Sequence, residues 1–398
     1  MSVIVRPADL AEQAKALAEV RHQIHRHPEI GLCLPHTEAI IVENLQKFGV
    51  DEIARNVGGK DVTGVVAVIR GSRPGRTIGV RADFDALGLN EKSGRPWACT
   101  MEKHMHACGH DGHTSTLLAA VSWLCAHRDF AGIVCAIFQP GEEGYAGGRC
   151  MIEDGLIERF GIEEFYALHC DPSVPYGKVG FIPGYATANA DIFDIRFEGK
   201  GGHGSRPHLS KDPVVAACEA VMAFQTIAAR SVSPDDAAVV TVGSVQGGSP
   251  DSTSVIPQFA TLRGTARSYE PHVQDIIEHR LEAISKGIAQ AYEMNVEVNY
   301  QRMYPSMFNN PERVAEAMGL ARESLGEENV LELKRSAEGE DFAFMLRAKP
   351  GLLFRLGMKD GDPCHESSLH SQTFDFNDNA IAIGASLLLT IALTRAAQ

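Results

Sequence analysis

The stretch GIVCAIF at residues 132–138 runs directly into QPGEEG at residues 139–144. An apolar run of this length, rich in β-branched residues and followed by Pro and Gly, is typical of a strand buried on both faces. Three further runs of this kind occur, at residues 62–69, 77–82 and 164–168. Helical apolar spacing marks residues 9–27, 113–126 and 379–395. Strands that alternate with helices predict an α/β fold, in which helices cover both faces of a mixed, mostly parallel sheet.

The middle of the chain follows a different pattern. Apolar and charged residues alternate from Phe193 to Glu198, which indicates a half-exposed strand. Asp212-Pro213 then provides an N-cap and a first helical residue. Two strands, a helix and a last strand follow, at 237–245, 259–267, 271–292 and 295–301. The order β-α-β-β-α-β predicts a ferredoxin-like domain. We therefore expect an inserted domain at 185–298 within a larger domain formed by 1–184 and 299–398.

Bulk composition limits the possible partners and compartment. The chain has 398 residues and a net charge of −14, which argues against binding to nucleic acid or to an anionic membrane surface. It has no continuous apolar stretch of about 18 residues, and residues 1–21 contain acids where a secretory signal would be apolar. Nine scattered cysteines fit free thiols in a reducing compartment. We expect a cytoplasmic protein.

One short segment concentrates metal-ligating side chains. Residues 104–113 contain four histidines, one cysteine and one aspartate. A thiolate and imidazoles at this density fit a transition-metal site. The alternative is a polar loop whose histidines have no common role, and a local cluster alone does not exclude it.

Other strand ends carry side chains of the same type. Glu142 and Glu143 follow the strand at 132–138, where one carboxylate can bind a metal while its neighbour acts as a general base on water. Asp83 and His169 stand at the ends of two other strands, and in an open α/β sheet ligands bind beyond the carboxyl ends of the strands. Taken singly, these residues fit an acidic turn or a structural histidine. Near the C-terminus, the residues alone do not decide between His365 and His370 as a further ligand.

Motifs of several other chemistries are missing from the sequence. It contains no G-x-S-x-G elbow, no P-loop and no C-x-x-C pair. A serine hydrolase of that type, a P-loop nucleotide-binding enzyme and a structural zinc site are therefore disfavoured.

The motifs resemble those of the M20 metallopeptidase family. They are MHACGHDGH at 105–113, QPGEEG at 139–144, GGHGS at 201–205 and LHS at 369–371. The likeness extends over nearly the whole chain and is greatest to the branch of hippurate hydrolases, aminoacylases and auxin-conjugate amidohydrolases. It implies a zinc-peptidase-like catalytic domain, an inserted ferredoxin-like lid or dimerisation domain, and a homodimer or dimer-based tetramer.

The resemblance also implies roles for individual residues. Cys108 looks like a thiolate that bridges two divalent ions, zinc or manganese, with cobalt or nickel possible. The terminal ligands would be His110, Glu143, His169 and His370. Glu142 resembles the general base, and Asp83 a carboxylate that orients a ligand histidine. His203 resembles an oxyanion donor that acts in the partner subunit's site, and Arg267 a residue that binds the substrate carboxylate.

The expected reaction is hydrolysis of the amide bond of an N-acyl amino acid. The alternatives are a dipeptidase or aminopeptidase of the same family and a non-catalytic homologue. Two positions depart from the branch. Gly141 replaces its usual alanine without removing either carboxylate, whereas Ser254 replaces an asparagine expected to contact substrate, which leaves the preferred amino acid open.

Overall fold

The computed structural model describes residues 3–398, which form two compact units. The first unit comprises the chain up to Gly184 together with Phe308–Lys334 and Asp341–Gln398. The second comprises Tyr185–Met307 and Arg335–Glu340. The predicted insertion, 185–298, ends nine residues before Met307, because its last strand continues to Tyr304. The short strand β7 (Gly184–Thr187) lies where the chain first passes into the second unit, and β14 (Met307–Asn309) lies where it first returns.

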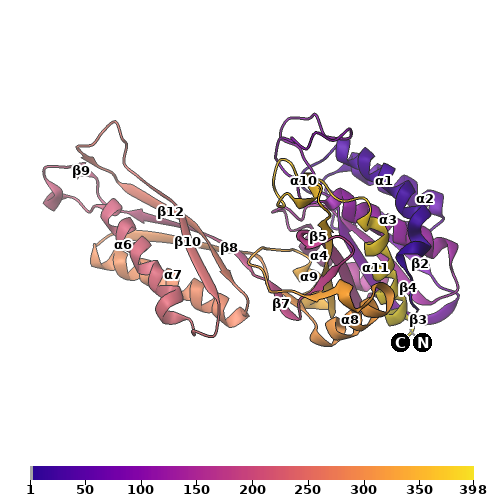
Figure 1. The fold of residues 1–398 in the computed structure, drawn as a ribbon. Helices are drawn as coiled ribbons and strands as arrows, with labels where there is room; N and C mark the ends of the chain where they lie inside the picture. The colour runs from indigo at the N-terminus through magenta and orange to yellow at the C-terminus, as the bar shows by residue number, and fades with distance from the viewer. Residues whose placement is uncertain (1–2) are drawn as a thin grey trace. The chain divides into compact units, whose positions relative to one another are not determined.

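The first unit is built on an eight-stranded sheet of order β1-β2-β4-β3-β5-β16-β6-β15 (Figure 1). Its strands are β1 Glu52–Ala54, β2 Val65–Arg70, β3 Arg73–Asp83, β4 Ala131–Gln139, β5 Glu164–Pro175, β6 Val179–Phe181, β15 Val330–Glu332 and β16 Gly351–Lys359. The four central strands, β4, β3, β5 and β16, are mutually parallel. Antiparallel pairs join β1 to β2, β2 to β4 and β16 to β6. The predicted mixed, mostly parallel sheet is confirmed.

Helices cover both faces of this sheet. They are α1 Ala11–Arg26, α2 Pro35–Phe48, α3 His110–Ala126, α4 Gly147–Glu153, α5 Leu156–Phe160, α8 Pro311–Leu325, α9 Ala343–Ala348, α10 Pro363–Glu366 and α11 Ala380–Ala396. On one face, Ile78 and Val80 of β3 join α3 and α11 in the main hydrophobic core. On the other face, Arg81 contacts Asp341 and Phe342 beside α9, and α4 packs on β4 and α9.

The second unit has one layer of strands and one layer of helices. Its sheet has the order β10-β12-β8-β13 and is antiparallel throughout. The elements follow the chain as β8 Ala190–Glu198, α6 Pro213–Thr226, β10 Ala238–Gly247, β12 Phe259–Ser268, α7 Pro271–Ala291 and β13 Asn295–Tyr304. Both helices pack against β12. A two-stranded ribbon, β9 (Gly202–His203) with β11 (Val255–Ile256), extends the unit. This is the ferredoxin-like order that the alternating pattern predicted.

One helical segment among residues 3–398, Pro213–Ser231, is long and apolar enough to span a membrane by length and composition alone. It joins α6 to a short helical turn and contains Glu219 and Arg230. Ala216, Ala220 and Phe224 of α6 are buried in the core of the second unit. The segment therefore forms part of a folded layer in this structure.

Candidate metal centre

The central strands of the first unit bring polar side chains together at one edge of the sheet. Asp83 ends β3, Gln139 ends β4, and His169 lies in β5. Because β3 is parallel to both β4 and β5, the residues that follow these strands gather at the same edge, where α/β proteins bind their ligands. Helix α3 begins here, at His110, directly after the loop that carries Cys108.

The turn after β4 presents Glu142 and Glu143 and is held by a third carboxylate. Gly141 and Gly144 have φ values of 68° and 90°, which glycine adopts without strain. The backbone N–H groups of Glu142 and Glu143 donate to the two oxygens of Asp85, each at 3.0 Å. No role was predicted for Asp85, although its place two residues after Asp83 is a usable signal. The Asp85 side chain therefore fixes the backbone position of both glutamates.

His110 and His169 are each held through Nδ1. The Nδ1 of His110 lies 3.0 Å from the carbonyl oxygen of Asp85, and that of His169 lies 2.8 Å from the carbonyl oxygen of Cys170. A carbonyl can only accept, so each Nδ1 carries the proton. Among residues 3–398 the buried Nε2 of His110 has no hydrogen-bond partner, and that of His169 lies 3.4 Å from the Cys108 sulfur. Both Nε2 lone pairs are thus suited to metal ligation.

Cys108 belongs to two sets of possible ligands. The donor atoms of Cys108, His110 and His169 lie within 4.8 Å of one another, and so do those of Cys108, Glu143 and His370. Burial, reinforced by the charge of Glu143, raises the pKa of the Cys108 thiol well above its ordinary value. Cations among these donors would reverse that effect and favour the thiolate. Cys108 is thus the donor common to the two sets that the five predicted ligands form, and it is the candidate shared ligand.

The structure separates the two C-terminal histidines. His370 Nε2 lies 3.1 Å from Glu143 Oε1, and the His370 backbone N–H donates to the carbonyl of Ala107 at 2.9 Å. His365 instead contacts Asp360 and Arg95, at 3.0 and 3.2 Å. The donor cluster thus includes His370.

The Asp83 carboxylate hydrogen-bonds to His113, which is not one of the predicted metal ligands. Its Oδ1 lies 2.6 Å from Nδ1 of His113, whose Nε2 accepts from the Cys170 backbone N–H at 2.9 Å. Both ring nitrogens of His113 are therefore used, which leaves no lone pair for a metal. Asp83 is 3.7 Å from His110 Nε2 and acts on that ring through charge. It is Asp85 that holds His110 directly, through its carbonyl and a carboxylate oxygen 3.3 Å away.

The charge of the site suits cations. Four carboxylates, those of Asp83, Asp85, Glu142 and Glu143, surround the histidines. Burial disfavours a charged imidazolium, yet Asp83 and Asp85 raise the pKa of His110 to about 10, so a divalent ion at Nε2 would take the place of a proton. Burial and the neighbouring His113 and Arg355 lower the pKa of His169 well below its usual value. A thiol, imidazoles and carboxylates with free lone pairs match the preferences of zinc-like divalent ions.

The two remaining predicted residues lie in the second unit. His203 is exposed on β9, and its Nδ1 accepts from the Ser205 backbone N–H at 3.1 Å. The proton of the neutral ring is therefore on Nε2, which can donate.

Arg267 is half-buried on β12, and its buried Nη1 has no hydrogen-bond partner in the described part of the chain. Burial lowers the pKa of Arg267, although the nearby carboxylate of Asp191 raises it. Ser254 lies beside the His203 loop, since its carbonyl accepts from Gly204 at 2.7 Å.

Fold and site together define an α/β enzyme with a candidate dinuclear metal centre. Residues 79–394 match the peptidase family M20/M25/M40, and the chain belongs to this family. It is 36% identical to the hippurate hydrolase of Campylobacter jejuni, with 94% of this chain and 95% of the relative covered. It is 34% identical to the N-acetyldiaminopimelate deacetylase of Priestia megaterium, over 93% and 96% of the two chains.

A solved structure extends the comparison. The YXEP protein of Bacillus subtilis, a dinuclear metal binding peptidase of the M20 family, superposes with a TM-score of 0.83 at 29% identity, with 96% of this chain and 98% of that chain covered. The protein is thus a hydrolase of the M20 amidohydrolase family that acts on amide bonds.

Proposed function

We propose that this protein hydrolyses the amide bond of N-acyl amino acids of the hippurate type, with two divalent ions bound by Cys108, His110, Glu143, His169 and His370. The observation that carries the proposal is the shared position of Cys108 in two donor sets beside Glu142. When bound, such ions lower the pKa of water and polarise an amide carbonyl. Zinc and manganese are the first candidates, and cobalt and nickel are compatible with the same donors.

Glu142 is placed to move the proton. Its side chain is 7% exposed, and its backbone is fixed by Asp85. Its Oε1 accepts from the Asp341 backbone N–H at 3.3 Å. As general base, Glu142 takes a proton from the attacking water and delivers it to the leaving amine, giving a carboxylic acid and a free amino acid.

The second unit supplies groups suited to substrate recognition, and we propose that it acts as lid and dimerisation domain. A half-buried guanidinium with an unused Nη1, that of Arg267, suits the α-carboxylate of the substrate. His203 Nε2–H suits the oxyanion of the tetrahedral intermediate. We propose that His203 serves the active site of the other subunit of a dimer.

An open edge and an apolar stripe in the second unit support a dimer. Strand β10 is an edge strand of ten residues, whose outer backbone groups can pair with a second copy. On α6, Val215 and Met222 are 48% and 72% exposed, and Cys218 between them is also exposed. Residues spaced in this way share one helix face. The nine free thiols of the described chain accord with the cytoplasmic location that we also propose.

A substrate panel tests the proposed reaction. Metal-loaded protein is offered N-benzoyl, N-acetyl, N-indoleacetyl and long-chain acyl amino acids beside free dipeptides, and Glu142→Gln is assayed in parallel. We expect cleavage of acyl amino acids and a loss of about 10²–10⁴-fold in turnover for Glu142→Gln with metal content unchanged. Cleavage of dipeptides alone would assign a peptidase. No cleavage of any substrate by protein that holds both ions would favour a non-catalytic role.

A further inference from the structure

His370 stands in a segment whose backbone is set by its surroundings. It lies between α10 and α11, in a stretch without helix or strand. Its φ of 62° is one that a residue with a side chain adopts only where neighbouring structure imposes it. Its side chain is 54% exposed, so packing alone does not orient the ring. Beside its own contacts to Glu143 and Ala107, the position of the His370 imidazole therefore depends on the groups that hold its flanks.

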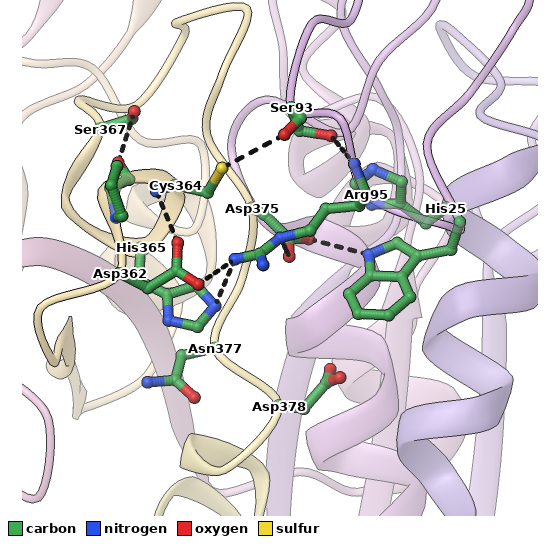
Figure 2. Close-up of polar contacts among 12 residues, drawn as sticks. His25, Ser93, Arg95, Asp362, Cys364, His365, Ser367, Asp375, Asn377 and Asp378 are labelled. Atoms are coloured by element: carbon green, nitrogen blue, oxygen red, sulfur yellow. Dashed lines mark hydrogen bonds and ion pairs between the residues drawn. The ribbon is translucent and has the colours of Figure 1, made fainter.

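One guanidinium contacts both flanks. Arg95 Nη2 donates to Asp362 Oδ2 at 2.7 Å, eight residues before His370. Arg95 Nε lies 2.8 Å from Asp375 Oδ2, five residues after it. Figure 2 shows the Arg95 side chain extending between these two carboxylates. Arg95 itself belongs to the loop that leads to Cys108, so it ties together two irregular segments that carry candidate ligands.

The Asp375 end of this bridge is buried and shared. The Asp375 side chain is fully buried, whereas that of Arg95 is 21% exposed. Asp375 Oδ1 also accepts from Arg21 Nη1 at 2.9 Å and from the indole N–H of Trp97 at 3.2 Å. Trp97 in turn has the Arg95 guanidinium 5.9 Å from its ring centre. A contact to a buried, multiply bonded carboxylate loses less to solvent than a surface ion pair does.

We propose that Arg95 is a positioning residue for His370: by bridging Asp362 and Asp375 it holds the His370 ring against Glu143 and Cys108. The inference rests on the proposed two-metal function and adds a residue that touches no ligand atom. Removal of Arg95 should release the His370 segment and lower the affinity for one ion, while Cys108, His110 and His169 continue to bind the other. A lysine cannot replace the bridge, because a single ammonium lacks the planar fork that reaches two carboxylates.

Metal titration of stripped protein tests this. Zinc binding to wild type, Arg95→Ala and Arg95→Lys is measured by calorimetry, and Trp97 fluorescence is followed in a Trp123→Phe background, since the chain has only two tryptophans. Loss of a contact that orients a metal ligand commonly weakens metal binding by about 10- to 100-fold. We expect wild type to bind two equivalents of zinc. In Arg95→Ala the affinity for the first equivalent should be unchanged, and the affinity for the second should be lower by that factor. Excess zinc should restore turnover to near the wild-type value.

Arg55→Ala is the matched control. It removes an ion pair to another buried carboxylate, that of Glu38 at 2.7 Å, close to the 2.8 Å between Arg95 and Asp375. It should leave both zinc affinities unchanged. If Arg95→Ala does not fold, Asp362→Asn removes the more exposed contact alone and should weaken the same equivalent. Wild-type affinity for both ions in these variants would overturn the inference, as would equal weakening of both. A wild type that binds fewer than two equivalents would instead contradict the proposed function.

Discussion

The carboxylate of Asp85 offers the sharpest test of how the catalytic turn is built. It accepts the backbone N–H groups of Glu142 and Glu143, both at 3.0 Å, and is 1% exposed. A hydrogen bond to a charged group contributes about 1.5–3 kcal/mol. Asp85→Asn keeps one acceptor and turns an amide NH₂ toward the other N–H. The change should therefore cost on the order of 3 kcal/mol. Part of this cost should lower the free energy of unfolding, and the rest should be relieved by a shift of the turn.

The displacement should appear in turnover. A shift of about 1 Å in a catalytic group can cost roughly 10²-fold, so we expect kcat of metal-loaded Asp85→Asn to fall by about that factor, together with a lower thermal midpoint. Glu29→Gln is the control, because Glu29 also caps two consecutive N–H groups, of His36 and Thr37 at 3.1 and 2.8 Å. It should lower the midpoint and spare kcat. Wild-type kcat and midpoint in Asp85→Asn would refute the reasoning.

Three further predictions concern other sites. Arg267→Ala should raise KM strongly for substrates with a free α-carboxylate and little for their amides, and equal losses in steady-state assays would give Arg267 another role. Cys108→Ser should weaken metal binding, measured by dialysis and elemental analysis, more than Cys108→Asp, because a carboxylate can bridge two ions and a neutral hydroxyl is a poor substitute. Burial opposes ionisation of Glu164, but hydrogen bonds from Arg395, Tyr166 and Arg76 lower its pKa to about 2. Its stabilisation, on the order of 3 kcal/mol, is present above about pH 4.5 and lost toward pH 2. The thermal midpoints of wild type and Glu164→Gln should thus differ at pH 7 and converge in acid, and a constant difference would contradict this.

The sequence allowed the main sheet to be predicted where burial left a clear pattern. The apolar run at 132–138 became β4, and the helical spacing at 113–126 became most of α3. Strand β16 was not predicted. Its sequence GLLFRLGMK lacks β-branched residues, so its local preference is weak, and parallel pairing with β5 makes it a strand.

The candidate ligands were predictable because each stands in a short motif or at a strand end. The residues that orient them were not, because their partners are distant in sequence. Asp85 and Glu142 are 57 residues apart, and Arg95 and Asp362 are 267 apart. The residues alone did not decide between His365 and His370, and only the family resemblance implied His370; in the structure its N–H donates to the carbonyl of Ala107, a contact distant in sequence. Which histidine contacts Asp83 could also not be predicted, since His110 and His113 lie one turn apart on α3.

The central claim is that amide hydrolysis depends on two ions bound around Cys108. It is tested most directly by stripping the protein of metal, adding zinc or manganese back stepwise, and measuring bound metal and hippurate hydrolysis in the same samples. The account predicts no activity without metal, two ions bound per chain at saturation, and full activity only when both are present. Full hydrolysis by protein shown by elemental analysis to contain no metal would contradict it.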